Sequence, residues 1–495
     1  MINCIDKIVN RTILEKTAGH FKEKKIILPT FAQMRDPQTI PESIKNALHH
    51  IGLWDLHPLN LFRINWKNEP LTKGGLFGPV NALEIPAELT GVEARILMLI
   101  GHWFPTGAHK VGAAYGCLAP RLVSGQFDPA YHRAVWPSTG NYCRGGAFDS
   151  YLMGCQAVAV LPEEMSRERF DWLAGIGAEI IKTPGCESNV KEIYDKCREI
   201  KHSRPEAVIL NQFDEFGNAV WHYSVTGPAL EEVYDTIKTT DSRLSAFVSA
   251  TGSAGTIAAG DYLRKKVPQI KIIASEALQC PTLLLNGFGA HRIEGIGDKH
   301  VPWIHNVRNT DVVTAIDDND CLHLFRLFNE PAGRQVLTGK GIDKNVIGSL
   351  SWLGISSIAN LLSAIKTAKY YEMNADDIIL SVATDSAQLY QSRLKEMTAQ
   401  SGKYQALQAE KDLERYLFAA GTDFLEELNY PAKKRIHNLK YYTWVEQQGK
   451  EVADLNRLWY DRGLWDDIFN QSHKWDQMIN QFNEMTGLQK TEYKK

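Results

Sequence analysis

The sequence lacks the features that would assign it to several large classes of protein. No apolar run approaches the roughly 18 residues of a membrane-spanning helix, and the first residues do not follow the basic-then-apolar pattern of a secretory signal. Charge of either sign is not in excess, with 55 basic and 58 acidic residues and a formal net charge of −3. We therefore expect a cytoplasmic protein that binds neither nucleic acid nor a membrane surface.

Cysteine is sparse, and its spacing shows no framework. The eight cysteines among 495 residues form no C-x-x-C pair. In a chain of this length, scattered cysteines are typical of reduced thiols rather than of disulfides or a zinc site, so we expect no metal. No internal repeat or low-complexity tract is present. A G-x-G-x-x-G loop after an early strand is also missing, which disfavours a nicotinamide-dependent dehydrogenase.

The length and the changes in pattern along the chain predict two or three domains. The composition is that of an ordinary globular protein, with 44% hydrophobic and 23% charged residues. Residues 1–90 carry loop signals and few periodic runs, so we expect an irregular arm that wraps the rest. Residues 91–397 show α/β alternation. Residues 398–495 are first polar and then rich in aromatic residues at helical spacing, which predicts a helical extension packed on the α/β region or on a partner subunit.

The α/β region predicts two open, mostly parallel sheets covered by helices. Strand-like runs lie at 95–100, 133–136, 156–161, 179–182 and 207–210, and again at 246–248, 272–274, 312–316 and 378–382. Helix-like segments lie at 108–123, 142–153, 167–175, 190–200, from 256, 319–329 and 357–371. Several of the strands, such as residues 157–161, are apolar at successive positions. Such strands are buried on both faces, as in a parallel sheet with helices on each side.

Short polar motifs follow four of these strands. Lys110 lies just beyond the first strand, in the sequence P-T-G-A-H-K at 105–110. The sequence S-T-G-N follows at 138–141, G-S-A-G-T at 252–256 and T-D-S at 384–386. Because ligands of open α/β sheets lie outside the carboxyl ends of the strands, we expect these motifs to meet. An amine, an anion cradle and small hydroxyl donors suit a cofactor that carries an aldehyde and a phosphate.

The ordered series of motifs resembles the fold-type II pyridoxal-phosphate enzymes, the tryptophan synthase β superfamily. The S-T-G-N sequence resembles the T-S-G-N loop of that group, and G-A-H-K at 107–110 is nearest to the lysine segment of the tryptophan synthase β chain. Further motifs at 211–213, 226–228, 293–297 and 354–357 occur in the order found in cysteine synthase and cystathionine β-synthase, the nearest family. The resemblance covers about residues 92–397. It implies a homodimer and a small mobile subdomain at about 117–220 beside a larger cofactor domain.

The resemblance also implies a role for each motif residue, with pyridoxal 5'-phosphate (PLP) as cofactor. Lys110 would hold PLP through an imine and would later remove the Cα proton of the substrate. Asn141 would bind the ring oxygen of PLP, and Ser386 would face its pyridine nitrogen. The phosphate would be bound by Gly252, Ser253, Ala254, Gly255 and Thr256, at the positive end of a helix. The substrate carboxylate would be bound by Ser138, Thr139, Gly140, the backbone around Tyr142, and Gln212.

Several of these residues also have a simpler structural interpretation. The Ser, Thr and Asn of 138–141 are favoured helix caps, and Gln212 could be a buried structural amide. Cys143 is best explained as a small buried residue. Tyr142 and Arg144 depart from the cysteine synthase pattern; they either shape the substrate pocket, with Arg144 meeting a second carboxylate, or lie on the covering helix. Asp385 is expected to be a cap or turn residue.

The chemistry that these residues imply is a reaction at the β carbon of an amino acid. A neutral hydroxyl at Ser386 cannot protonate the ring nitrogen as an aspartate would, which suits a β substituent that leaves promptly. We therefore expect β-elimination or β-replacement on cysteine, serine or an O-activated serine through an aminoacrylate, and both a lyase and a synthase remain open. Dehydration of serine or threonine and a diaminopropionate ammonia-lyase activity are alternatives, as is a non-catalytic scaffold protein. The segment 297–300 (G-D-K-H) places charge near the expected site entrance.

Overall fold

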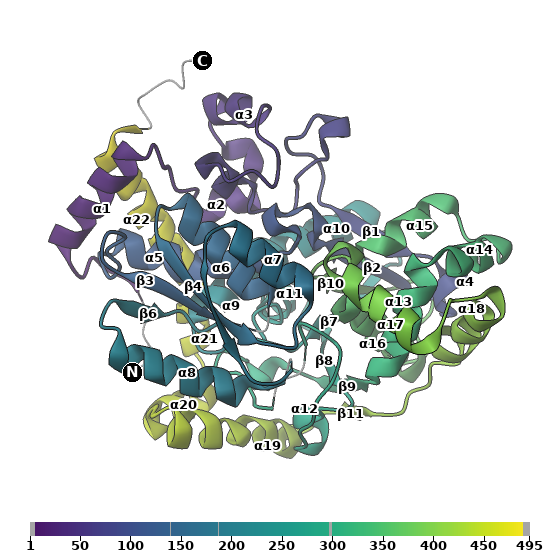
Figure 1. The fold of residues 1–495 in the computed structure, drawn as a ribbon. Coiled ribbons are helices and arrows are strands. Elements are labelled where there is room, and N and C mark those ends of the chain that lie inside the picture. The colour runs from purple at the N-terminus through teal and green to yellow at the C-terminus, as the bar shows by residue number, and fades with distance from the viewer. Residues whose placement is uncertain (1–4, 139, 187, 297–298, 489–495) are drawn as a thin grey trace.

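The computed structural model describes residues 5–138, 140–186, 188–296 and 299–488, and within them the strands form two sheets. The larger sheet runs, in spatial order, β1 (Ala82–Ile85), β2 (Arg95–Ile100), β10 (Asp377–Ala383), β7 (Arg243–Ala250), β8 (Lys271–Ala277), β9 (Val312–Ile316) and β11 (Leu425–Glu427). The smaller sheet runs β5 (Glu179–Thr183), β4 (Gln156–Pro162), β3 (Arg133–Pro137) and β6 (Ala207–Ile209). The sheets lie side by side in the molecule (Figure 1).

Both sheets are parallel apart from two edges of the larger one. Strands β2, β10, β7, β8 and β9 pair in parallel, while β1 and β11 pair antiparallel at the two outer edges. All pairs of the smaller sheet are parallel. The predicted fold class, two open and mostly parallel sheets covered by helices, is confirmed.

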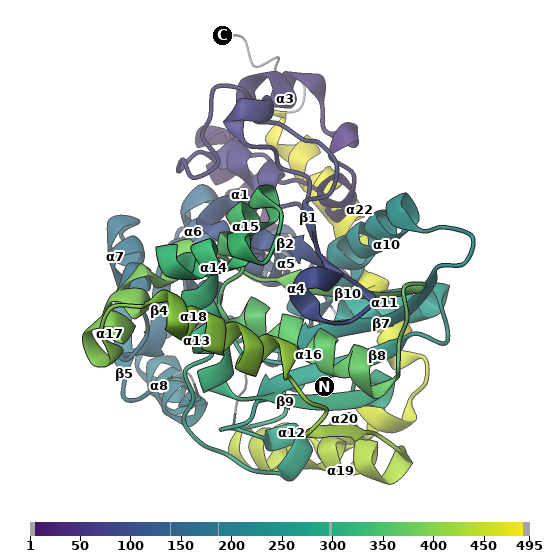
Figure 2. The same cartoon turned by 90° about the vertical axis from the view of Figure 1, so that its right-hand side faces the viewer.

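Helices cover these sheets along the whole α/β region. In chain order, the helices before β7 are α4 (Ala87–Thr90), α5 (Lys110–Val123), α6 (Asn141–Leu152), α7 (Arg167–Gly175), α8 (Val190–Ser203), α9 (Phe216–Trp221) and α10 (Gly227–Ile237). Those that follow are α11 (Ala258–Lys266), α12 (Thr282–Leu285), α13 (Asp318–Asn329), α14 (Pro331–Gly339), α15 (Lys344–Ser349), α16 (Ile355–Tyr370) and α17 (Gln391–Ser401). In Figure 2, α16 crosses one face of the larger sheet.

The alternation of side chains along the central strands explains the two cores of the larger sheet. In β2, Leu97 and Leu99 belong to the hydrophobic core shared with α5 and α11, whereas Ile96, Met98 and Ile100 belong to the core shared with α13 and α16. Successive side chains of a strand point to opposite faces, so a strand covered on both sides must be apolar at every position. This is why the continuous apolar runs in the sequence predicted parallel strands correctly.

The strands and helices expected from the sequence agree with the structure to within a few residues, but several further elements were not expected, among them the helices α9, α10, α14 and α15. The helix after the glycine-rich stretch begins at Ala258 rather than at residue 256. The edge strands β1 and β11 were not expected, and β11 lies in the region for which we predicted only helices. These edge strands have four and three residues, which is too short for a period of two to stand out.

The two ends of the chain pack against each other. The N-terminal helices are α1 (Arg11–Glu23), α2 (Phe31–Arg35) and α3 (Glu42–Leu48); the C-terminal ones are α18 (Ala406–Asp412), α19 (Tyr430–Lys440), α20 (Val452–Tyr460), α21 (Leu464–Phe469) and α22 (Gln471–Thr486). Helices α1 and α22 lie side by side at one end of the molecule (Figure 1). The rings of Phe21 and Phe482 meet edge to face at 5.1 Å, and Asn483 makes two hydrogen bonds with the backbone of Leu28. Much of the aromatic surface of the C-terminal region, including Trp444 and Trp475, is thus buried within the same chain.

No single helix in the described ranges has both the length and the apolarity needed to span a membrane. One pair of consecutive segments, 344–352 and 355–370, meets both criteria when taken together, but the two are bent by 119° relative to each other. The second of them is α16, whose side chains are almost all buried in the core of the larger sheet. A helix that is covered by protein on all sides is apolar all round, so it passes a hydropathy test for membrane spans.

Candidate functional site

Lys110 is the first residue of α5 and lies in a buried position between the two sheets. Its Nζ donates hydrogen bonds to Ser253 Oγ at 2.9 Å and to Gln212 Oε1 at 3.4 Å, and only 9% of the residue is exposed. The turn from β2 into α5 needs Gly107, which has a φ of +69° and lies so close to Trp54 that a Cβ would be 2.7 Å from its ring. The predicted lysine, glutamine and glycine-rich motifs are therefore brought together.

The glycine-rich loop at 252–256 follows β7 and approaches its neighbours very closely. A Cβ on Gly252 would lie 2.8 Å from the carbonyl oxygen of Gly295, and one on Gly255 would lie 2.0 Å from Asn218 Oδ1. Ala254 adopts a positive φ of 58°, which a non-glycine residue rarely does. Ser253 Oγ accepts from Asn218 Nδ2 at 2.9 Å as well as from Lys110, so its position is fixed. The loop leaves no room for larger side chains and presents a hydroxyl and backbone beside a buried amine.

Asn141 and Asp385 face each other across the site. Asn141 Nδ2 donates to Asp385 Oδ2 at 2.6 Å, and the hydroxyl of Tyr390 donates to the same oxygen at 2.6 Å. Asn141 Oδ1 is buried and has no hydrogen-bond partner in the described part of the chain. The expectation that Asp385 is a cap or turn residue is wrong, because its side chain is fully buried and bonds to these two side chains. Burial raises the pKa of Asp385, and the nearby Arg169 charge opposes that rise.

A buried charge network continues from Tyr390. The hydroxyl of Tyr390 accepts from Arg169 Nη2 at 3.1 Å, and Arg169 also forms an ion pair with Glu294. Arg393 Nε lies 2.7 Å from the other oxygen of Glu294. The network joins α7, which packs on the smaller sheet, to α17 and to the segment that contains Glu294. The sequence did not reveal it, because its members lie far apart in the chain and follow no common spacing.

Ser386 lies just beyond β10, and its hydroxyl has a histidine partner. Ser386 Oγ is 2.9 Å from His102 Nδ1. His102 belongs to the short 3-10 turn η4 (Gly101–Trp103), which follows β2. Strands β2 and β10 are parallel neighbours with Ile100 paired to Ala383, so their carboxyl ends adjoin. Sequence reasoning missed His102, although its place directly after a strand was the same signal that had singled out Ser386.

The expected carboxylate-binding residues lie partly in one place. Gln212 Nε2 donates to Ser138 Oγ at 3.2 Å, and the backbone N–H of Gly140 donates to the same hydroxyl at 3.1 Å. The side chains of Ser138 and Asn141 do not cap α6, which has no side-chain cap. Thr139 lies outside the described residues. Ser138, Gln212, Lys110 and Ser253 thus form one connected polar cluster.

The three residues after Asn141 are all buried on α6. The Tyr142 ring packs edge-on against Trp136 at 5.3 Å in the hydrophobic core, so its side chain does not narrow the site. Cys143 Sγ donates to the carbonyl of Gly140, and burial raises the pKa of the Cys143 thiol to about 12, which supports a structural role. The guanidinium of Arg144 lies over the ring of Trp172, 4.9 Å from its centre.

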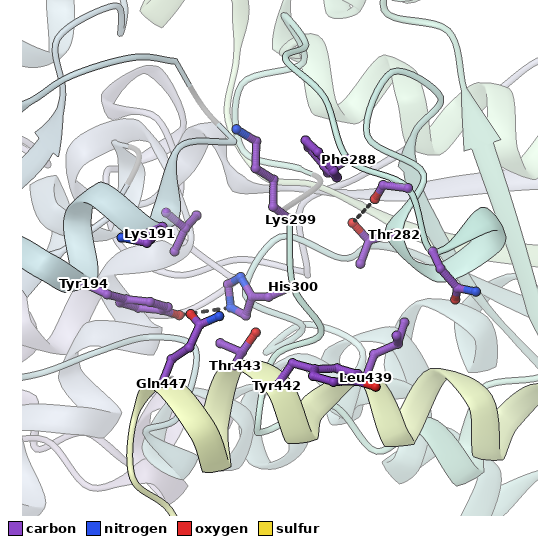
Figure 3. A pocket seen from close by; sticks show the side chains of 13 residues that line it. Lys191, Tyr194, Thr282, Phe288, Lys299, His300, Leu439, Tyr442, Thr443 and Gln447 are labelled. Atoms are coloured by element: carbon purple, nitrogen blue, oxygen red, sulfur yellow. Dashed lines mark hydrogen bonds between the residues drawn. The ribbon is translucent and has the colours of Figure 1, made fainter.

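A separate cavity of about 450 Å³ lies where the C-terminal region meets α8 (Figure 3). His300 and Tyr194 lie next to each other in its lining, with 3.0 Å between His300 Nε2 and the tyrosine hydroxyl. Tyr442 and Gln447 of the short helix η11 (Tyr441–Gln447) line one side. The charged segment expected near the site entrance is only partly described: Gly297 and Asp298 lie outside the described residues, while Lys299 and His300 line this cavity.

Comparison with known proteins identifies the group to which this site belongs. The model of the family described as pyridoxal-phosphate dependent enzyme matches residues 79–334, which is more than half of the chain. The chain belongs to the pyridoxal-phosphate-dependent enzyme family. It is therefore a PLP-dependent enzyme, and the matched residues include the lysine, the asparagine and the glycine-rich loop described above.

Individual proteins and solved structures are similar to this chain over more than half of its length. The chain is 28% identical to a probable cysteine synthase of Bacillus subtilis over 300 residues, covering 60% of this chain and 89% of that protein. It is 24% identical to the cystathionine beta-synthase of Saccharomyces cerevisiae over 398 residues, covering 78% and 74%. Among solved structures, a hydrogen sulfide-producing enzyme from Fusobacterium nucleatum superposes with a TM-score of 0.53 at 23% identity, covering 62% of this chain and 95% of that one. The structural likeness confirms the fold.

The residues present fit PLP. A covalently bound aldehyde needs a buried amine, which Lys110 supplies, and a phosphate needs a narrow loop without side chains, as at Gly252 and Gly255. The unpartnered oxygen of Asn141 and the hydroxyl of Ser386 are further polar atoms that a polar ring could engage. In the described ranges, no group of three or more His, Cys, Asp or Glu residues is placed to hold a metal ion.

Proposed function

We propose that this PLP-dependent enzyme catalyses β-elimination or β-replacement on a small L-amino acid, namely cysteine, serine or an O-activated serine. The observation that carries the proposal is the buried Lys110 amine, which donates to Ser253 in the glycine-rich loop and lies beside Gln212. The relatives support the reaction class, since they are named cysteine synthase, cystathionine beta-synthase and hydrogen sulfide-producing enzyme.

In this proposal the motif residues bind the cofactor. Lys110 would hold PLP at its aldehyde carbon, and the loop from Gly252 to Thr256 would hold its phosphate with Ser253 and backbone N–H groups. Asn141 would bind the ring oxygen, and Ser386 would face the ring nitrogen. When bound, PLP supplies an electron sink that stabilises negative charge at the Cα of the substrate.

The same side chains then position the substrate and move a proton. With PLP bound, the Lys110 amine would serve as the base for the Cα proton of the substrate, and its burial would keep water away from that proton. Gln212 Nε2 donates to Ser138 Oγ, and Gln212 Oε1 accepts from Lys110 Nζ at 3.4 Å, so these polar groups are held near the amine. We propose that Gln212, Ser138 and the backbone of Thr139, Gly140 and Tyr142 bind the substrate carboxylate.

The direct test is to assay pyruvate, ammonia and sulfide release from cysteine, serine, O-acetylserine and O-phosphoserine, with and without a thiol acceptor. Release of pyruvate without acceptor would identify a lyase, and a thioether product with acceptor a synthase. The Lys110→Ala variant is expected to lose both turnover and the borohydride-trappable yellow chromophore. The exposed Lys411→Ala serves as the matched control and should retain both. A trappable chromophore in Lys110→Ala would contradict the lysine assignment, and a wild type that binds no PLP would favour a scaffold protein.

We also propose a homodimer that works in the cytoplasm on small amino acids. The seven cysteines in the described residues are free thiols, which supports a reducing compartment such as the cytoplasm. The dimer rests on the family resemblance and on apolar side chains left exposed, such as Leu71 and Phe288. Light scattering at working concentration checks the dimer, and a monomer mass would refute it.

A further inference from the structure

The cavity of about 450 Å³ between α8 and the C-terminal region is separate from the Lys110 site (Figure 3). Its described lining includes no residue of the polar cluster around Lys110. The lining comes from α8, from residues 282–288 with 299 and 300, and from α19 and η11 of the C-terminal region. Protein interiors leave few voids larger than a water molecule, and this volume lies within the range of small-molecule sites. The cavity is therefore large enough to hold a ligand.

We propose that this cavity binds a small organic anion with a flat apolar body, of which an aromatic carboxylate is the simplest example. The inference goes beyond the proposed function and does not depend on it, because it requires neither Lys110 nor a particular reaction.

The charge of the lining favours an anion. Two lysines, Lys191 of α8 and Lys299, belong to the described lining, and no acidic residue does. Lys191 is paired with Asp195 of the same helix, whereas Lys299 forms no ion pair within the described part of the chain. The charge of Lys299 is thus available to a ligand, and its attraction for an anion is that of a solvent-exposed cation.

The apolar part of the lining favours a flat ring. Tyr442 and Phe288 are 60% and 77% exposed, and both belong to the lining together with Leu439. Figure 3 shows Tyr442 and Leu439 on the side of the C-terminal region and Phe288 on another side. Large apolar side chains that gather at a hollow mark a binding site more often than scattered ones do. An apolar body placed between them would bury surface that water now covers, which stabilises the complex.

The floor of the cavity is a buried and uncharged cluster of rings. His300 is 8% exposed, and burial lowers its pKa to about 3, so its imidazole is neutral. The ring of Trp444 lies 5.6 Å from that of His300 and 5.9 Å from that of Tyr194, and Trp444 Nε1 donates to the carbonyl oxygen of Val301 at 2.8 Å. These contacts fix the floor before a ligand arrives, which lowers the entropic cost of binding.

Polar groups beside this floor can bind a carboxylate. The hydroxyl of Thr443 and the amide of Gln447, both of η11, lie next to His300 in the lining (Figure 3). A hydroxyl and an amide N–H are donors, so both can bond to a carboxylate oxygen. Selection by charge is left to Lys299, because none of these groups is ionised.

The test is calorimetric titration of the full chain, with PLP bound, using cinnamate and the uncharged cinnamamide of the same shape. We expect cinnamate to bind more tightly than cinnamamide. Lys299→Gln should weaken cinnamate binding about fivefold, as for one exposed ion pair, and should leave cinnamamide binding unchanged. Tyr442→Ala should weaken the binding of both compounds, because it removes apolar contact and no charge. Both changes are at exposed positions, so the variants should fold.

The control variant is Lys344→Gln, at an exposed position of α15 outside the cavity, which should bind both compounds as the wild type does. The inference is overturned if cinnamate shows no saturable binding, if it binds no better than cinnamamide, or if neither cavity variant changes its affinity. Displacement of cinnamate by excess L-serine would place it at the Lys110 site and would also overturn the inference. Loss of a dimer in Tyr442→Ala, measured by light scattering, would instead assign this face to a contact between subunits.

Discussion

Asn141 Nδ2 donates a hydrogen bond of 2.6 Å to Asp385 Oδ2, between residues that are 244 positions apart in the chain. Asn141 begins α6, beside the smaller sheet, and Asp385 follows β10 in the larger one. The bond therefore links the two halves of the site, and it fixes the orientation of the Asn141 amide. Because Nδ2 is bound to Asp385, Oδ1 is the end of the amide that is left without a partner.

The first prediction concerns this bond and the affinity for PLP. Asp385→Ala removes the acceptor, so the Asn141 amide can rotate and we expect the apoenzyme to bind PLP about tenfold more weakly, as for one lost bond to a charged acceptor. Asp385→Asn keeps one oxygen that can accept, so its affinity for PLP should lie between those of Asp385→Ala and the wild type. Fluorescence titration of apoenzyme with PLP measures this. Asp376→Asn, whose half-exposed side chain lies just before β10, should match the wild type; equal affinities for Asp385→Ala and wild type would contradict the prediction.

The second prediction concerns the ion pair of Arg169 with Glu294, which is almost fully buried. Arg169→Met leaves Glu294 paired with Arg393, at 2.7 Å, so we expect the free energy of unfolding to fall by about 3 kcal/mol, the lower end for a broken buried pair. Arg167→Met is the matched control on the same helix, because its pair with Asp171 is exposed and should be worth about 0.5 kcal/mol. Urea unfolding of the apoenzymes compares them. Equal losses of stability in the two variants would show that breaking the buried pair costs no more than breaking the exposed one.

The sequence predicted those parts of the fold and site that depend on local pattern. Continuous apolar runs predicted β2, β4 and β10, because strands covered on both faces need apolar residues throughout. The polar motifs after β2 and β7 predicted that Lys110 and Ser253 would meet, since the ends of parallel strands share an edge, and the family resemblance added Gln212. In each case the signal lies in a few consecutive residues.

What the sequence could not predict depends on pairing between distant residues. His102 and Ser386 are joined by the order of strands in the sheet, with β10 returning beside β2, and neither residue shows this in its own neighbourhood. Asp385 resembled a turn residue because Asp often is one, and only packing against Asn141 and Tyr390 shows otherwise. The aromatic C-terminal region was compatible with several packing partners. Its contact with the N-terminal arm depends on tertiary structure alone.

The third prediction concerns how the C-terminal region is held on the α/β region. Lys440 of α19 is fully buried, and its Nζ donates to the carbonyl oxygens of Trp303 at 2.9 Å and His305 at 2.7 Å. Lys440→Met keeps the volume but leaves two buried carbonyls unpaired, which should cost about 2 to 4 kcal/mol of stability. Thermal unfolding followed by tryptophan fluorescence measures the change. Lys411→Met, at an exposed position of α18, should be neutral, and a neutral Lys440→Met would show that the buried amine is dispensable.

The last prediction is a pH dependence of stability that originates at Asp261. This carboxyl is buried in α11 and accepts from Asn306 Nδ2 and Asn309 Nδ2, both at 2.6 Å, and burial raises its pKa from 3.8 to about 7. The folded state thus binds the proton more tightly than the unfolded state, so this group's contribution to stability is greatest at low pH, falls between about pH 4 and 7, and is constant above. Asp261→Asn keeps an accepting oxygen and cannot ionise. We therefore expect it to match the wild type near pH 4 and to exceed it at pH 8, by up to about 4 kcal/mol. Unfolding midpoints of the variant and the wild type at both pH values measure this difference in stability. The exposed Asp241→Asn is the control. A difference between Asp261→Asn and the wild type that does not depend on pH would refute the assignment.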